Sequence, residues 1–99
     1  MDSPRVTVVD EVENSRFVTT EDGLGGELTY SADGDRLVLL HAEVPPTLRG
    51  KGVAAHLVQA AIDRARRNGE TIAPWCGYTR RWLKEHPAEA AGVTIQWDG

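Results

Sequence analysis

The sequence has a single cysteine, no excess of positive charge and no long apolar run, and each absence excludes a class of protein. One cysteine in 99 residues, Cys76, excludes an internal disulfide and a zinc site built from several cysteines, and it fits a reducing compartment. Eleven basic against fifteen acidic residues give a net charge of −4, which argues against a protein that binds the phosphate backbone of nucleic acid. The longest apolar run, Leu37 to Leu40, is too short for a membrane span, and residues 1–5 do not resemble a secretory signal. We therefore expect a cytoplasmic protein that binds neither nucleic acid nor membrane.

What the sequence does contain is the composition of an ordinary globular protein. Apolar residues make up 40% of the chain and charged residues 26%. A chain of this length buries roughly two-thirds of the surface that it exposes when unfolded, so one core is enough to hold it. We expect a single domain over residues 1–99, as a monomer or a homodimer.

The first 44 residues alternate short apolar segments with turns, the pattern of antiparallel strands. We expect strands over residues 6–9, 16–20, 27–30 and 36–44, with the first hairpin turning at 13–15. In the fourth strand, strict alternation places His41 and Glu43 on the same face as Leu39. Both faces of that strand are apolar in its first half, which indicates a central strand.

The hydrophobic period changes after Pro45 and Pro46. Apolar residues recur at three- and four-residue spacing, which predicts an amphipathic helix that ends at Asn68 and Gly69. The residues expected on its buried face are Ala54, Leu57, Val58, Ala61, Ile62 and Ala65. A short strand at 71–73 follows and ends at Pro74.

The last third of the sequence predicts a second helix over residues 78–86, with Tyr78, Trp82 and Leu83 facing the core. Alternation at residues 93–97 suggests a last strand. A strand, a helix and a second strand in succession imply a right-handed crossover, so the strands on either side of the long helix should be parallel. The expected fold is α/β: a mixed, mostly antiparallel sheet whose fourth and fifth strands are parallel, with the long helix packed on it.

The segment from His41 to Ala54 is the one that predicts chemistry, because a strand leads through a glycine-containing loop directly into a helix. Free backbone N–H groups and the positive end of the helix dipole form an anion site at such a helix start. Arg49 and Lys51 add positive charge, while Gly50 and Gly52 let a phosphate approach the backbone. The spacing matches neither the phosphate loop of nucleotide triphosphatases nor the dinucleotide fingerprint. The expected ligand group is a phosphate or a pyrophosphate, although a simple turn would use the same glycines.

The run from Arg49 to Ala54 resembles the Arg/Gln-x-x-Gly-x-Gly/Ala signature of the GNAT N-acetyltransferases. The flanking segments, His41 to Pro45 and Pro74 to Cys76, resemble those of very short members of that family, and the resemblance covers residues 26–87 well. It implies a GNAT-like fold that binds acetyl-CoA between the fourth and fifth strands. Backbone amides would hold the pyrophosphate, and an amide near Val44 would polarise the thioester carbonyl. The residues that the resemblance assigns to the cofactor are Val44, Arg49, Gly50, Lys51, Gly52, Val53 and Ala54.

The same resemblance suggests four catalytic candidates, each with a plainer alternative. Glu43 is the candidate base that removes a proton from the acceptor amine; the alternative is that it is an acidic surface residue without a catalytic role. His41 is a rival base or a core histidine. Cys76 is a nucleophile that would carry the acetyl group, or a small packing residue. Tyr78 would protonate the departing CoA thiolate, or it packs in the core.

The function that the resemblance implies is direct transfer of an acetyl group from acetyl-CoA to a primary amine, on a small molecule or a peptide. The alternatives are transfer through an acyl group on Cys76, a CoA-binding module without catalysis, or a structural domain. Longer members of the family have two helices after the first strand that help to form the acceptor pocket. This chain has a turn there, so the acceptor side is open or is completed by a partner subunit. The spacings of the three histidines and Cys76 match no zinc pattern, and no metal is expected.

Overall fold

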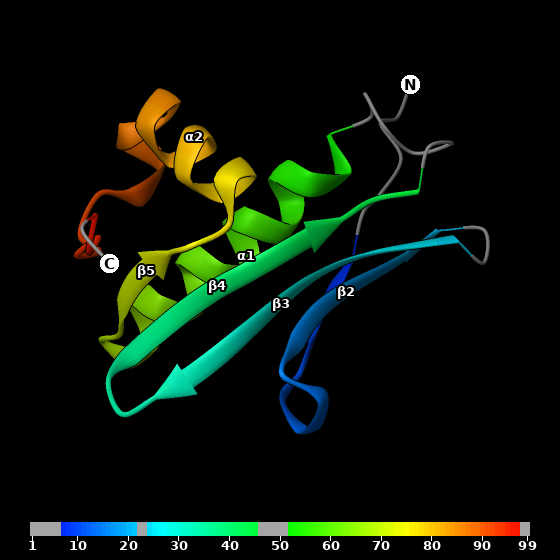
Figure 1. The fold of residues 1–99 in the computed structure, drawn as a ribbon, viewed down its shortest axis with the longest axis horizontal. Helices are drawn as coiled ribbons and strands as arrows, with labels where there is room; N and C mark the ends of the chain where they lie inside the picture. The colour runs from blue at the N-terminus through cyan, green and yellow to red at the C-terminus, as the bar shows by residue number, and fades with distance from the viewer. Residues whose placement is uncertain (1–6, 22–23, 46–51, 98–99) are drawn as a thin grey trace.

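The computed structural model describes residues 7–21, 24–45 and 52–97 and has the α/β architecture expected from the sequence (Figure 1). Its elements are β1 (Val8–Glu11), the 3₁₀ turn η1 (Val12–Asn14), β2 (Arg16–Glu21), β3 (Leu24–Asp33), β4 (Arg36–Glu43), α1 (Val53–Asn68), β5 (Thr71–Pro74), α2 (Gly77–Glu85) and the 3₁₀ turn η3 (Pro87–Ala90). The strands form one sheet in the order β1-β2-β3-β4-β5, antiparallel except for the parallel pair β4 and β5. The mixed, mostly antiparallel sheet is therefore confirmed.

The core lies between the sheet and α1, which packs along one face of the strands (Figure 1). The predicted helical face is nearly the observed one, because its members are buried except Ala54, which is half-buried, and Val53 is buried as well. Gly69 ends the helix in the left-handed conformation, at φ 68°, as its position after Asn68 predicts. The core side chains from the sheet include Phe17, Leu28, Tyr30, Leu37, Leu39 and Ile72.

The opposite side of strands β1 to β4 is covered by no described helix, and we call it the open face (Figure 1). The pairing register defines the side chains that it carries, because residues directly opposite in an antiparallel pair share a face. Val18 opposes Glu27, and Glu27 opposes Glu43. The open face therefore carries Val18 and the charged side chains of Glu27 and Glu43 in one row, while the alternate residues Phe17 and Leu28 point to the core.

A β-bulge in β4 changes which residues share a face. Tyr30 opposes Leu39 and Thr29 opposes His41, so Leu40 is an extra residue in β4. The expectation that His41 and Glu43 lie on the face of Leu39 is therefore wrong. After the bulge, Ala42 and Val44 pack against the core, and His41 and Glu43 point to the open face. The bulge is what brings both candidate bases onto the uncovered side of the sheet.

The C-terminal third differs from the prediction in two places. Thr79 and Leu83 are the buried residues of α2, whereas Tyr78 is 39% exposed, so the expectation that Tyr78 faces the core is wrong. The expected last strand at residues 93–97 is reduced to one parallel bridge between Ile95 and Ile72. Among the described residues, no helix is long and apolar enough to cross a membrane.

A cluster of charged and polar side chains around Arg64 joins α1 to the sheet. Its guanidinium donates to Asp10 at 3.0 Å, to the Tyr30 hydroxyl oxygen at 2.7 Å and to both oxygens of Glu70 at 3.1 Å. The Tyr30 hydroxyl in turn donates to Asp10 at 2.5 Å. We call these four residues the Arg64 cluster. Because its members come from β1, β3, α1 and the residue before β5, it ties together segments far apart in the sequence.

Candidate functional site

The two parallel strands separate halfway along β4. Their pairing runs from Arg36 opposite Thr71 to Leu39 opposite Pro74. The backbone N–H groups of Trp75 and Cys76 then both donate to the Leu39 carbonyl, at 3.0 and 2.9 Å, and α2 begins at the next residue. Because β4 continues to Glu43, its second half has no partner strand on that side among the described residues (Figure 1). The sheet thus opens a gap between strands at the place where Pro74 was expected to end β5.

The start of α1 has the backbone geometry of an anion site. Gly52 caps the helix in the left-handed conformation, at φ 78°, and a Cβ there would meet nothing within 4 Å. Gly52 has no side chain that could bind the N–H groups of the first turn, and that turn carries no acidic residue. A phosphate fits such an end, because among the described residues no side chain caps its donors or fills the space beside Gly52, and the helix dipole is positive there. Arg49, Gly50 and Lys51, which belong to the same predicted loop, lie outside the described residues.

Gly26 in β3 brings the end of β4 and the start of α1 together. A Cβ at this position would lie 3.2 Å from a side-chain carbon of Val53 and 3.4 Å from both the Glu43 carbonyl and the Val44 side chain. The backbone N–H of Gly26 also donates to the buried Thr19 hydroxyl at 3.1 Å. A larger residue here would push its neighbours by a few tenths of an ångström, and the short contacts show that two parts of the predicted cofactor site lie next to each other.

The two candidate bases are neighbours on the open face. Glu43 and His41 are 69% and 66% exposed, and His41 Nε2 lies 3.8 Å from Glu43 Oε1. The alternative of a core histidine is therefore wrong for His41. Both side chains are reachable by a ligand or by water from the open face, and the fold places them together without distinguishing which one is the base.

Cys76 and Tyr78 lie at the start of α2, beside the gap. Cys76 is only 8% exposed, and its carbonyl accepts a hydrogen bond from the Thr79 hydroxyl at 2.9 Å. Burial raises the pKa of Tyr78, and so does the negative charge of Glu85. Tyr78 therefore keeps its proton at neutral pH. The exposed side chains of Leu40 and Trp75 add apolar surface to the segments that meet here.

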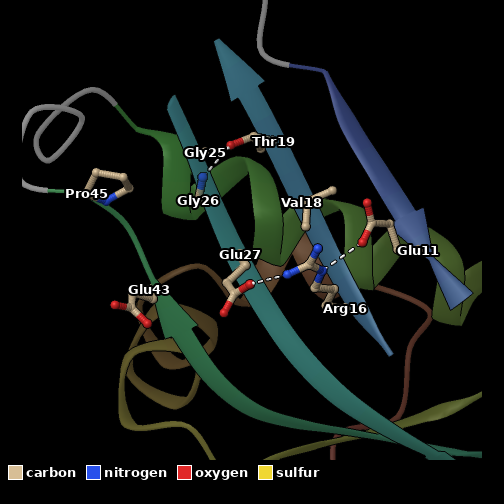
Figure 2. A pocket seen from close by; sticks show the side chains of 9 residues that line it. All are labelled: Glu11, Arg16, Val18, Thr19, Gly25, Gly26, Glu27, Glu43 and Pro45. Carbon is tan, nitrogen blue, oxygen red and sulfur yellow. Dashed lines mark hydrogen bonds and ion pairs between the residues drawn. The ribbon is translucent and has the colours of Figure 1, made fainter. Parts of the chain in front are cut away.

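A hollow of about 580 Å³ lies on the open face beside Glu43 (Figure 2). Its lining comes from β1 to β4 and from Pro45, which follows β4, and consists of Glu11, Arg16, Val18, Thr19, Gly25, Gly26, Glu27, Glu43 and Pro45. Arg16 lies between Glu11 and Glu27, donating to them at 2.7 and 2.9 Å, as Figure 2 shows. We call these three residues the Arg16 cluster. The hydrogen bond from Arg16 holds the pKa of Glu11 below its usual range, so Glu11 is ionised at neutral pH.

Reasoning from the sequence missed the Arg16 cluster as a candidate site. The available signal was alternation, because Arg16 and Glu27 each stand next to a core residue, Phe17 and Leu28, and so must face away from the core. Alternation does not reveal that these charged side chains share one hollow, which follows from the strand register. The described residues contain no group of three or more side chains that could hold a metal ion.

Comparison with known proteins supports the resemblance. The family described as GCN5-related N-acetyl-transferase has a model that matches residues 16–93. Protein NATD1 of Gallus gallus and of Mus musculus is 39% identical over 61 residues, which are 61% of this chain and 56% of each relative. Protein NATD1 of Homo sapiens is also 39% identical over 61 residues, or 54% of its length. The chain thus matches about half the length of these relatives. The family model covers most of the chain. The mixed sheet, the crossover and the gap between β4 and β5 agree with this match, so the chain belongs to the GCN5-related N-acetyltransferase family.

Proposed function

We propose that the chain transfers an acetyl group from acetyl-CoA directly to a primary amine. The observation that carries the proposal is the gap between β4 and β5, which opens beside the uncapped start of α1. Glu43, at the end of β4, faces the adjoining hollow. The start of α1 suits a pyrophosphate, and the hollow beside Glu43 suits an amine that approaches from the open face.

In this proposal the backbone of the chain binds and orients the cosubstrate. The N–H groups of Gly52, Val53 and Ala54 hold the pyrophosphate, together with Arg49, Gly50 and Lys51. The backbone near Val44 polarises the thioester carbonyl. Acetyl-CoA, when bound, supplies the activated acetyl group. The contact of Gly26 with Val53 and with the end of β4 supports this division of roles, because it sets the spacing between the two ends of the site.

The side chains of the chain move the protons. A carbon–nitrogen bond forms between the acetyl group and the amine, and the carbon–sulfur bond to CoA breaks. Glu43 accepts the proton that the amine loses, directly or through water, and His41 is the alternative acceptor 3.8 Å away. Tyr78 supplies the proton that the departing thiolate takes up, and its position at the start of α2, beside the strand gap, supports that role.

Direct transfer is favoured over a relay through Cys76. A relay needs a thiolate that the acyl group can reach, whereas Cys76 is buried and caps α2 with its carbonyl bonded to Thr79. We expect a serine at position 76 to retain acetyl transfer. We also expect mass spectrometry to find no acetylated enzyme after mixing with acetyl-CoA alone; an acetylated Cys76 that amine removes at the rate of turnover would overturn the direct route.

CoA binding tests the cofactor half of the proposal. Gly52→Asp adds a carboxylate where the phosphate should lie, and we expect it to weaken CoA at least tenfold by calorimetry. Gly34→Asp is the matched control, because Gly34 also has a positive φ, of 64°, with nothing within 4 Å, and lies in the turn between β3 and β4. Equal CoA affinity in the two variants would contradict the assignment.

The rate of acetyl transfer tests the catalytic half. We expect Glu43→Gln to lower kcat at least tenfold at neutral pH while CoA affinity stays within twofold, because only the proton acceptor is removed. If His41→Ala has this effect and Glu43→Gln does not, the base is His41. The high exposure of both side chains keeps a second function in view, a CoA-binding module without catalysis. CoA binding with no transfer to any amine would favour that module.

A further inference from the structure

We propose that the hollow on the open face is the acceptor pocket and that Glu27 makes it select amines with a second positive charge. This inference rests on the proposed acetyl transfer and adds to it the class of acceptor. The hollow adjoins the end of β4 where Glu43 lies, so an amine inside it has the candidate base within its own binding site (Figure 2).

The first argument is the position of Glu27. It lies directly opposite Glu43 in the register of β3 and β4, and both side chains point to the open face. Residues so placed have Cβ atoms about 5 Å apart, and like charges in such pairs destabilise a sheet. Among the described residues Glu43 has only His41 within 4 Å as a partner of opposite charge. A cation bound between the two carboxylates relieves the repulsion.

The second argument is the charge balance of the whole lining. Three carboxylates, those of Glu11, Glu27 and Glu43, face one guanidinium, that of Arg16. Arg16 engages one oxygen of Glu11 and one oxygen of Glu27. Among the described residues, the second oxygen of Glu27 has no hydrogen-bond donor. The pocket therefore has a free carboxylate oxygen that can accept a hydrogen bond from an incoming ammonium group. It repels an amine substrate that also carries a carboxylate.

The third argument is reach. Neighbouring strands are about 4.8 Å apart, so the row from Glu43 on β4 through Glu27 on β3 to Val18 on β2 extends about 10 Å. Two ammonium groups on a four-carbon chain are roughly 6 Å apart when the chain is extended. An amine of this kind places its reacting nitrogen near Glu43 and its second nitrogen near Glu27. Val18 and Pro45 also line the hollow and add apolar surface to it.

Acceptor kinetics test the proposal with three probes of equal chain length. We expect kcat/KM to be at least tenfold higher for 1,4-diaminobutane than for butylamine, and lowest for 4-aminobutanoate. Glu27→Gln should lower the ratio of kcat/KM for the diamine to that for butylamine about fivefold. The wild-type ratio should also decrease as salt is added, because the second contact is between exposed charges.

Asp63→Asn is the matched control, because it removes the same charge from an exposed position on α1, away from the hollow. It should leave the ratio unchanged. Equal rates for diamine and butylamine in the wild type, or equal losses in Glu27→Gln and Asp63→Asn, would overturn the selectivity. Calorimetry with 1,4-diaminobutane and no acetyl-CoA separates the two proposals. If the diamine binds in a Glu27-dependent manner and no amine is acetylated, the proposal of acetyl transfer fails, whereas the proposal that the hollow binds diamines is retained.

Discussion

Two arginines of this chain each lie between carboxylates, yet they have different roles. Arg64 lies on the core side of the sheet, where its side chain is 11% exposed, and it binds Asp10 and Glu70. Arg16 lies on the open face, 39% exposed, and binds Glu11 and Glu27. Each arginine binds two carboxylates, and the Arg64 cluster also contains the Tyr30 hydroxyl. What differs is burial and the number of separate chain segments that each cluster joins.

Burial decides what each cluster contributes. A buried ion pair that loses one partner leaves an uncompensated charge and costs about 3 to 5 kcal/mol. Exposed pairs contribute little, because water and salt screen them. The Arg64 cluster joins four segments, whereas the Arg16 cluster joins three neighbouring strands that are already paired through their backbones. The comparison suggests that one cluster holds the fold and that the other is available for a ligand.

The largest effect should follow from Arg64→Met. It leaves the buried Glu70 carboxylate, which is 7% exposed, without its guanidinium, and it removes the tie from α1 to β1 and β3. We expect the free energy of unfolding to decrease by about 3 to 5 kcal/mol in urea titrations. Arg67→Met, at an exposed position of the same helix, is the control and should change it by less than about 0.5 kcal/mol. Similar losses in the two variants would contradict the role of the Arg64 cluster in holding the fold.

An intermediate effect should follow from Tyr30→Phe, which removes only the hydroxyl of the Arg64 cluster. Because that hydroxyl bonds to charged partners, we expect a loss of about 1.5 to 3 kcal/mol at pH 7. Burial raises the pKa of Tyr30 to about 12, helped by the Asp10 carboxylate. The unfolded chain releases this proton near pH 10 and the folded chain does not, so the contribution is complete below pH 10 and is lost as pH rises towards 12. The difference in unfolding free energy between wild type and Tyr30→Phe should therefore decrease over that interval. A constant difference would contradict the raised pKa.

Much of the fold could be predicted because its signals are local. The three- and four-residue spacing of apolar residues from Leu57 to Ala65 predicted α1, and the glycine at position 69 predicted where the helix ends. The strand-helix-strand order gave the parallel pair of β4 and β5. These features depend on hydrophobic periodicity and on turn chemistry, both of which can be read from a few consecutive residues.

The features that could not be predicted depend on contacts between distant segments. The bulge at Leu40 reverses the faces of β4, and a strictly alternating pattern is unable to show where an extra residue enters. Arg64 sits among polar residues of α1 and reads as a solvent-exposed side chain, but Asp10, 54 residues away, and Tyr30 give it buried partners. Tyr78 was expected in the core because of its spacing from Trp82, while α2 buries Thr79 and Leu83 instead. The gap in the sheet beside Glu43 was anticipated only through the family resemblance.

The smallest effect on stability, and the most informative one on function, should come from Arg16→Met. Because the Arg16 cluster is exposed and its strands are held by backbone pairing, the melting temperature should change much less than in Arg64→Met. The variant also frees the oxygens of Glu11 and Glu27 that Arg16 engages, which makes the hollow more negative. We expect the ratio of kcat/KM for 1,4-diaminobutane to that for butylamine to increase about threefold, opposite in sign to Glu27→Gln. If the ratio falls in both variants, Arg16 acts by orienting Glu27 rather than by neutralising it. The opposite signs therefore test whether charge balance, rather than the shape of the hollow, sets the choice of acceptor.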